Sequence, residues 1–296
     1  MMRPILAIVG PTATGKTKLS IALAKKLKGE IISCDSMQFY KGLDIGTAKV
    51  RKEEMEGITH HLIDILEPDS EFSVAIYQEI VRKKIAELEE KNITPILVGG
   101  SGLYISSVLY DYRFDGQKRD DEIESQYDDY STKELAELLK EVNPHLAEKT
   151  DLKNRRRLLR ALQNQEEDIE FTADNPFYDN AIVIGLDMDR ETLYERIDKR
   201  VDLMIEEGLE VEAKKLYDDY FETQAAMAIG YKEFFHYFTG KISKEEAIDQ
   251  IKKNSRHYAK RQLTWFRNKF DCFWIMVDPD HFEKAIEEAL LISNYL

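Results

Sequence analysis

The segment GPTATGKT, from Gly10 to Thr17, has residue types whose spacing suits the binding of phosphate groups. It fits the pattern G-x-x-x-x-G-K-[ST], follows the apolar run ILAIV and precedes a stretch with a helical period. In such a loop backbone N–H groups surround an anion, Lys16 neutralises phosphate oxygens and the Thr17 hydroxyl can bind Mg²⁺. A tight turn without a ligand is the less favoured alternative, because a strand and a helix flank the loop. The predicted diphosphate-binding residues are Gly10, Pro11, Thr12, Ala13, Thr14, Gly15, Lys16 and Thr17.

An acidic side chain, Asp35, directly follows the apolar run EIISC. Ligands of open α/β sheets bind at the carboxyl ends of the strands, so Asp35 and Ser36 are expected near the phosphates. A carboxylate there can bind magnesium or accept a proton from a nucleophile. Alternatively, Asp35 only caps the next segment, as Asp often does after a strand. Taken alone, this local pattern suits a small-molecule kinase and leaves open what is attached to the phosphates.

Short apolar runs rich in β-branched residues recur along the chain and predict strands. They comprise residues 5–9, 30–34, 61–66, 95–100, 181–186 and 273–277. Segments with a helical period separate the first four runs, among them residues 16–27 and 73–90. This alternation predicts an α/β fold with a parallel sheet core flanked by helices, similar to that of the P-loop NTPases.

The character of the chain changes after about residue 112, where charged residues become frequent and no convincing strand follows until residue 181. Helical patterns occur at residues 132–142 and 152–163, and they return from residue 190 onward. The chain is therefore expected to form two parts: a P-loop α/β catalytic core of residues 1–112 and 180–296, and a helical insertion domain of residues 113–179.

The composition limits the class of protein. The formal net charge of −14 argues against indiscriminate binding to nucleic acid, because Lys and Arg contacts to phosphate supply most of that affinity. No apolar run approaches the ~18 residues of a membrane span, and residues 5–10 lack the features of a secretory signal. A cytoplasmic protein without a membrane partner is expected, with Cys34 and Cys272 as small core residues.

Two local clusters of basic residues stand out against this acidic background. Residues 252–269 contain seven Lys or Arg and no Asp or Glu. If this segment is helical, one face carries a polar stripe made of Lys253, Arg256, His257, Lys260, Thr264 and Arg267. The second cluster is made of Lys153, Arg155, Arg156, Arg157 and Arg160. Each cluster suits a local RNA-binding face, although a solvated helix or pairing with the acidic tract at residues 120–129 would also explain the charges.

Several segments together resemble the tRNA dimethylallyltransferase family, in the family's order and over nearly the whole chain. Beside the phosphate loop they are DSMQFYKGLDIGTAK (35–49), HHLID with EFSVAIYQ (60–78), PILVGGSGLYISSVL (95–109), NRRRLLRALQ (154–163), RETLYERIDKRVDLMIEEGLEVEAKKL (190–216), AIGYKE (228–233) and RHYAKRQLTWFR (256–267). The first and the last of these are the most specific. The sequence ends without the Cys–His finger of some eukaryotic relatives, and in this respect it is similar to the compact bacterial form.

The resemblance implies a prenyl transfer. In this family dimethylallyl diphosphate gives its five-carbon group to the exocyclic amine of the adenine beside the anticodon, on its 3′ side, and diphosphate is released. The phosphate loop would hold the diphosphate, whose charge Lys16, Mg²⁺ on Thr17 and Arg261 would stabilise. Asp35 corresponds to the base that accepts a proton from the amine. The catalytic residues implied are thus Asp35, Lys16, Thr17 and Arg261.

The same resemblance implies that the partners are dimethylallyl diphosphate and the anticodon stem-loop of tRNA. A monomer without an obligate protein partner is expected. The tRNA-binding residues implied are Asp35, Ser36, Met37, Gln38, Ser101, Leu159, Arg160, Ala161, Leu162, Gln163, Arg256 and Lys260. The sequence departs from the family at Lys232, where some relatives have Arg, and at residues 164–175, which replace a short Thr-Gly turn.

Three other functions stay open at this stage. A small-molecule kinase would use ATP, and a nucleotide-gated RNA-binding module would have no chemistry of its own. A prenyltransferase acting on free adenine nucleotides would not need the two basic clusters. His60 and His61 are expected to be structural, because adjacent side chains of a strand point to opposite faces and no third metal ligand is evident. Trp265 and Trp274 are expected to pack in the core rather than to stack on bases.

Overall fold

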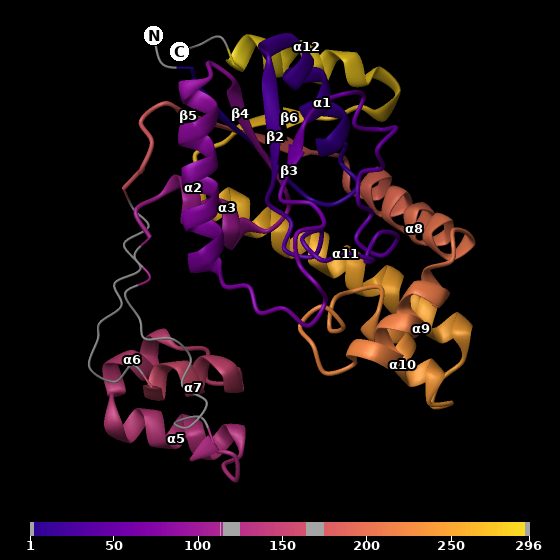
Figure 1. The fold of residues 1–296 in the computed structure, drawn as a ribbon. Coiled ribbons are helices and arrows are strands. Elements are labelled where there is room, and N and C mark those ends of the chain that lie inside the picture. Colours follow the sequence, from indigo (N-terminus) through magenta and orange to yellow (C-terminus); the bar gives the residue numbers. More distant parts are fainter. Residues whose placement is uncertain (1–2, 113, 115–124, 164–174, 294–296) are drawn as a thin grey trace. The chain divides into compact units, whose positions relative to one another are not determined.

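The computed structural model describes residues 3–112, 114, 125–163 and 175–293, and Figure 1 shows its fold. The chain divides into two compact units, Met1–Asp111 with Asp174–Leu296 as the first and Tyr112–Ala173 as the second. The described part of the first unit is an α/β structure and that of the second is helical. The predicted fold class is therefore confirmed. The departure from the family at residues 164–175 lies outside the described residues, except for Asn175.

In the described part of the first unit, six parallel strands form one sheet in the order β3-β2-β4-β1-β5-β6. The strands are β1 (Ile5–Val9), β2 (Gly29–Ser33), β3 (His60–His61), β4 (Thr94–Val98), β5 (Ala181–Asp187) and β6 (Phe273–Met276). All residues of the central strand β1 are fully buried. A strand covered on both faces has a continuous apolar sequence, which explains the run ILAIV before the phosphate loop. The loop therefore begins at the carboxyl edge of the sheet, where ligands bind.

One predicted strand is wrong in extent. Of the run at residues 61–66 and its neighbour, only His60–His61 pair with β2. Leu62 and Asp64 have left-handed backbone angles, with φ of 62° and 55°, which an extended strand cannot contain. The run is nevertheless apolar because Leu62 and Leu66 pack with a core cluster. The segment thus bends away from the sheet edge while its apolar side chains stay covered.

Helices cover both faces of the sheet (Figure 1). Those of the first unit are α1 (Lys16–Leu27), α2 (Val74–Glu90), α3 (Gly102–Leu109), α8 (Arg190–Glu206), α9 (Leu209–Tyr220), α10 (Lys232–Phe238), α11 (Lys244–Lys269) and α12 (Phe282–Ser293), with a 3₁₀ turn at Pro279–His281. Side chains of β1 alternate between two core clusters, so that Ile8 meets Leu19 of α1 on one face and Val9 joins the cluster of Tyr77 from α2 on the other. A third cluster joins α9, α10 and α11 around Tyr231 and Phe234.

The second unit contains α5 (Thr132–Val142), α6 (Pro144–Lys149) and α7 (Arg155–Gln163). Ser131 caps α5: it accepts a hydrogen bond from the Glu134 N–H, and the Glu134 carboxylate accepts one from the Ser131 N–H. The core of this unit is formed by the apolar stripes of α5 and α7, including Leu135 and Leu158, which are fully buried. Arg156, Arg157 and Arg160 of α7 are exposed, whereas Arg155 donates to the carbonyl oxygens of Tyr127 and Tyr130.

Candidate active site

The phosphate loop connects β1 to α1 through an unusual backbone. Gly10, Ala13 and Gly15 have positive φ angles of 137°, 67° and 94°. A Cβ on Gly10 would lie 2.4 Å from the carbonyl oxygen of Leu186, and one on Gly15 would lie 2.5 Å from the ring of Phe282. Both glycines are required by space as well as by backbone conformation, because β5 and α12 press against the loop.

The cation of the loop, Lys16, is held at its centre. The Lys16 Nζ donates to the carbonyl oxygens of Gly10 at 3.0 Å and Pro11 at 2.7 Å. Burial lowers the pKa of Lys16 to about 7; the nearby Arg200 lowers it as well, and Asp35 opposes both effects. Thr17 follows in the first turn of α1 with an exposed side chain. An anion bound to this loop would therefore contact the Lys16 side chain and the exposed first turn of α1.

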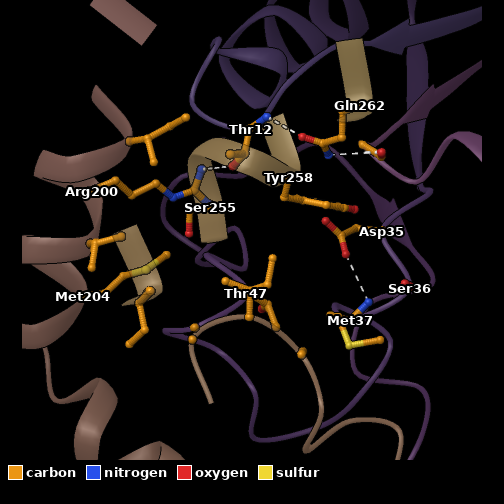
Figure 2. A pocket seen from close by; sticks show the side chains of 18 of the residues that line it. Thr12, Asp35, Ser36, Met37, Thr47, Arg200, Met204, Ser255, Tyr258 and Gln262 are labelled. Atoms are coloured by element: carbon orange, nitrogen blue, oxygen red, sulfur yellow. Dashed lines mark hydrogen bonds between the residues drawn. The ribbon is translucent and has the colours of Figure 1, made fainter. Parts of the chain in front are cut away.

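A glutamine from the far end of the chain fixes the loop from the side. The Gln262 Oε1 accepts the Thr12 N–H at 3.0 Å, and the Gln262 Nε2 donates to the Gly100 carbonyl oxygen at 3.1 Å (Figure 2). Gln262 belongs to the segment KRQ but was not predicted from the sequence as a site residue. Its amide satisfies one backbone group on each of two separate loops, and it is almost fully buried.

Two arginines of α8 also reach the loop, and neither was predicted from the sequence. The Arg200 Nη1 donates to the Thr12 Oγ1 at 2.9 Å, and the Arg196 Nε donates to the Ala13 carbonyl oxygen at 3.0 Å. Residues four apart share one face of a helix. The spacing of two arginines after the fifth predicted strand was therefore the signal that could have identified them.

Asp35 lies at the carboxyl end of β2, across the cavity from α8 (Figure 2). Its Oδ1 accepts the Met37 N–H at 3.0 Å, so the capping role considered from the sequence is present. The other carboxylate oxygen lies on the side of Tyr258 (Figure 2). Burial raises the pKa of the Asp35 carboxyl, and the Met37 N–H, Lys16 and Arg200 hold it down. A half-buried carboxylate of this kind suits proton transfer, because its proton affinity exceeds that of an ordinary Asp.

Tyr258 from α11 covers Asp35 and remains a neutral phenol. Burial raises the pKa of Tyr258 to about 12, and the Asp35 carboxylate raises it too, while hydrogen bonds with Ser101 and Gln262 act in the opposite direction. The Ser101 Oγ also lies 3.5 Å from the Ser36 nitrogen. The predicted residues Ser36 and Ser101 are thus neighbours of Asp35 in space.

One cavity of about 440 Å³ unites these groups. Its polar wall contains Thr12, Lys16, Asp35, Ser36, Arg200, Arg261 and Gln262. Its apolar wall contains Ile197, Val201, Met204, Met227, Ile229 and Ile251. Met37 and Lys232 line it as well, and Lys232 begins α10. The cavity thus offers an anion cradle, a carboxylate and an apolar compartment in one space.

Two loops that form part of the cavity wall are held by carboxylates. Glu212 of α9 accepts the N–H groups of Asp44 at 2.9 Å, Ile45 at 3.0 Å and Gly46 at 2.9 Å, and the Tyr231 hydroxyl at 2.7 Å. In the other loop, the Gly230 N–H donates at 2.9 Å to the buried Glu233, which also accepts from Asn254 at 2.8 Å. These hydrogen bonds hold the two loops, which contribute Gly46 and Gly230 to the cavity wall.

The predicted basic stripe of α11 is only partly free. Lys253, His257 and Lys260 are exposed. Arg256 is paired with Asp198, and the Arg267 Nη2 lies 2.5 Å from an oxygen of the buried Asp187. Two of the six stripe residues therefore neutralise acids of the first unit. Trp265 and Trp274 pack against a core cluster, as expected.

The remaining predicted residues lie at other places. Gln38 donates from Nε2 to the Thr47 carbonyl oxygen at 3.4 Å, beside the cavity. In the second unit the side chains of Leu159, Ala161 and Leu162 are buried in the core, whereas Arg160 is exposed. His60 interacts with the Ile58 carbonyl oxygen and His61 with Glu30, which agrees with structural roles.

A phosphate loop after the central strand of a parallel sheet, facing a carboxylate across a part-apolar cavity, defines a P-loop α/β enzyme for substrates that carry a phosphate chain. Residues 38–269 match the model of the IPP transferase family. The chain belongs to this family, and the resemblance inferred from its motifs is confirmed. No helix among the described residues is long and apolar enough to cross a membrane.

Individual relatives agree with the family match. The chain is 51% identical to the tRNA dimethylallyltransferase of Bacillus pumilus over 299 residues, which cover 97% of this chain and 94% of that protein. The structure of a tRNA isopentenylpyrophosphate transferase from Staphylococcus epidermidis is 41% identical, with a TM-score of 0.75 and coverage of 99% and 100%. A eukaryotic dimethylallyltransferase captured acting on tRNA is 28% identical, with a TM-score of 0.85 and coverage of 99% of this chain and 79% of that one.

Proposed function

We propose that this protein transfers the dimethylallyl group of dimethylallyl diphosphate to the exocyclic amine of an adenine in tRNA, 3′-adjacent to the anticodon, and releases diphosphate. The observation that carries the proposal is the single cavity that an anion-binding loop, a half-buried carboxylate and an apolar compartment share. A diphosphate ester with a short apolar group needs the first and the last, and an incoming amine needs the carboxylate. The relatives named above support tRNA as the acceptor.

The diphosphate is the leaving group in this proposal. When the allylic carbon–oxygen bond breaks, its electron pair goes to the diphosphate, and negative charge grows there in the transition state. The loop N–H groups, Lys16 and Arg200 meet at this point, because Lys16 and Arg200 both contact the loop. Such fixed donors stabilise developing charge without reorganising. We assign Arg261, which also lines the cavity, to the same task.

The proposal includes a magnesium ion bound at the phosphate loop. Among the described residues no group of three His, Cys, Asp or Glu side chains could hold a metal, so a metal here would depend on substrate oxygens. Mg²⁺ prefers that arrangement, with few protein ligands, several waters and phosphate oxygens. The exposed Thr17 hydroxyl at the start of α1 would be the protein ligand. When bound, the ion would add positive charge beside the departing diphosphate.

The base in this proposal is Asp35. The lone pair of an adenine amine is delocalised into the ring, so attack on the allylic carbon is assisted when a base removes the proton as the carbon–nitrogen bond forms. The raised pKa of Asp35 favours this proton transfer. Ser36, Met37, Gln38 and Ser101 would surround the base at the same end of the cavity.

The recognition of the tRNA is assigned to the exposed basic residues of both units. Lys260 of α11 and Arg160 of α7 are exposed, and we propose that they contact tRNA phosphates. Positive faces on a chain of net charge −14 would admit RNA in one orientation and repel it elsewhere. The proposal includes a monomeric enzyme that acts in the cytoplasm, where tRNA is available.

A label-transfer assay tests the function. The protein is incubated with Mg²⁺, labelled dimethylallyl diphosphate and either unmodified tRNA or AMP. Label in the tRNA, with diphosphate released in equal amount, is the expected result. Label only in AMP would instead identify a prenyltransferase for free nucleotides, and ATP turnover without label transfer would identify a kinase. If the protein bound RNA but transferred no label, it would be an RNA-binding module without chemistry of its own.

A further inference from the structure

We propose that Met204 sets the length of the isoprenoid chain that the enzyme accepts, so that five-carbon donors fit and ten-carbon donors do not. This inference rests on the proposed function, because it takes an allylic diphosphate as the donor. Its basis is the order in which side chains of α8 line the cavity.

One face of α8 runs along the cavity from the phosphate loop to the apolar compartment. Ile197, Arg200, Val201 and Met204 all line the cavity, at the spacing of three and four residues that keeps side chains on one helix face. Arg200 contacts Thr12 of the phosphate loop at 2.9 Å, so the helix at this level marks the diphosphate end. Met204 is one turn further along, and Figure 2 shows it farther from Thr12 than Arg200 is.

The helix supplies a length scale. With a rise of ~1.5 Å per residue, the four residues from Arg200 to Met204 span about 6 Å along the helix axis. From its reactive carbon to its farther methyl carbon, a dimethylallyl group measures about 4 Å, because three carbon–carbon bonds of about 1.5 Å or less separate them. A five-carbon chain that starts at the diphosphate end therefore ends near Met204. A second isoprene unit would need about 5 Å more and would, on this proposal, meet the Met204 side chain.

The surroundings of Met204 explain why this side chain acts as a stop. Met204 also packs against the third core cluster, which includes Val201, Ala247 and Ile251. Met204 therefore lines the cavity on the side of this cluster, and its truncation would enlarge the apolar compartment there. Met227, the other methionine of the apolar wall, is 57% exposed.

The test compares dimethylallyl diphosphate with geranyl diphosphate, a ten-carbon allylic diphosphate, as donors to unmodified tRNA. Contacts with one methylene change kcat/KM on the order of 10–200-fold. We expect Met204→Ala to raise the ratio of geranyl to dimethylallyl kcat/KM at least ~10-fold over wild type. Met204→Phe should raise the KM for dimethylallyl diphosphate and leave the affinity for pyrophosphate unchanged. Leu203→Ala is the matched control, because Leu203 is on the same helix but 49% exposed and outside the cavity wall.

The outcomes separate the inference from the proposed function. If wild type transfers no dimethylallyl group to tRNA, the proposed function fails. If wild type does so but Met204→Ala keeps the wild-type donor ratio while it binds pyrophosphate normally, Met204 does not set the chain length. A Met204→Ala protein that no longer folds leaves Met204→Phe to decide, and an unchanged KM for dimethylallyl diphosphate in that variant overturns the inference.

Discussion

The Gln262 side chain accepts the Thr12 N–H of the phosphate loop at 3.0 Å, although 250 residues separate the two in sequence. The same amide donates to the Gly100 carbonyl oxygen, so one buried side chain on α11 ties two loops at the carboxyl edge of the sheet. The shape of the phosphate loop therefore depends on the last long helix as well as on its own glycines. This dependence can be measured.

Gln262→Leu keeps the volume of the side chain but removes both hydrogen bonds. Since the Thr12 N–H and the Gly100 carbonyl would lose their partner, stability should fall by about 1–3 kcal/mol. The affinity for pyrophosphate should fall about 10-fold, because the loop amides would no longer be held in place. Thr264→Ala is a matched control, since its exposed hydroxyl donates only to a carbonyl of its own helix. Pyrophosphate binding by Gln262→Leu at wild-type strength would contradict this role.

Asp35→Asn should lose activity and gain stability at neutral pH. Loss of a general base typically costs a factor of about 10²–10⁴ in turnover. The pKa of Asp35 is raised in the folded state, so its stabilising contribution is present at low pH and is lost as the pH rises through the folded pKa. Asn stays neutral and can still accept the Met37 N–H. The melting temperature of Asp35→Asn should therefore exceed that of wild type by about 2 °C at pH 8, and the difference should shrink toward pH 4.

Asp189→Asn provides a control of opposite sign. Hydrogen bonds from the N–H groups of the first turn of α8, chiefly that of Thr192, lower the pKa of Asp189. Its stabilising contribution is therefore present at neutral pH and is lost on acidification, so Asp189→Asn should melt below wild type at pH 8. Calorimetry across this pH range checks both signs. If Asp35→Asn melted lower than wild type at pH 8, or turned over like it, the role of Asp35 would be wrong.

Arg200→Met should move the acidic limb of the pH–activity profile. The positive charge of Arg200 lowers the pKa of Asp35, so its removal raises that pKa further and protonates the base at a higher pH. We expect kcat/KM to fall about 10²-fold through weaker stabilisation of the leaving group, and the acidic limb to shift to higher pH. Arg196→Met is the comparison, because Arg196 is exposed and donates to the Ala13 carbonyl. If the acidic limb of the pH–activity profile did not shift in Arg200→Met, the charge of Arg200 would not influence the pKa of the catalytic base.

Local patterns predicted most of the fold and several of the residues that the cavity brings together. The phosphate loop and Asp35 were found because each lies within a few residues of an apolar strand. The predicted strand at 61–66 failed because left-handed φ angles at Leu62 and Asp64 leave no trace in hydrophobic periodicity. Apolar side chains predict burial there, but they do not predict the path of the backbone.

Ion-pair and hydrogen-bond partners that lie far apart in the chain could not be predicted from a single sequence. Arg256 and Arg267 belong to a basic stripe, and their acids Asp198 and Asp187 come from another helix and a strand 58 and 80 residues away. Arg200 and Gln262 acquire their roles only when α8 and α11 pack beside the phosphate loop. The spacing of residues along one helix indicates which of them share a face. Which residues of other elements pack against that face can be known only from the folded structure.

Glu212 illustrates the same limit. It is one acidic residue in a charged helix, yet its two oxygens accept three successive backbone N–H groups at Asp44 to Gly46, and the Tyr231 hydroxyl. A Cβ on Gly46 would lie 2.6 Å from the Tyr231 ring, so the loop is pressed against that side chain. The next residue, Thr47, lines the cavity and accepts from Gln38. Glu212 therefore positions the loop beside the segment that carries Asp35.

Glu212→Gln replaces one acceptor oxygen by an NH₂ group that would face backbone donors. Stability should drop by about 1–3 kcal/mol, and kcat/KM with tRNA should fall about 10-fold or more, while pyrophosphate affinity is retained because the phosphate loop is not touched. Glu210→Gln on the same helix should change neither, since its ion pair with Lys244 lies near the surface, where such pairs contribute little. If Glu212→Gln lost pyrophosphate affinity and kcat/KM with tRNA to the same extent, general unfolding would be the cause. If neither quantity fell, the loop from Asp44 to Gly46 would hold its position without this carboxylate.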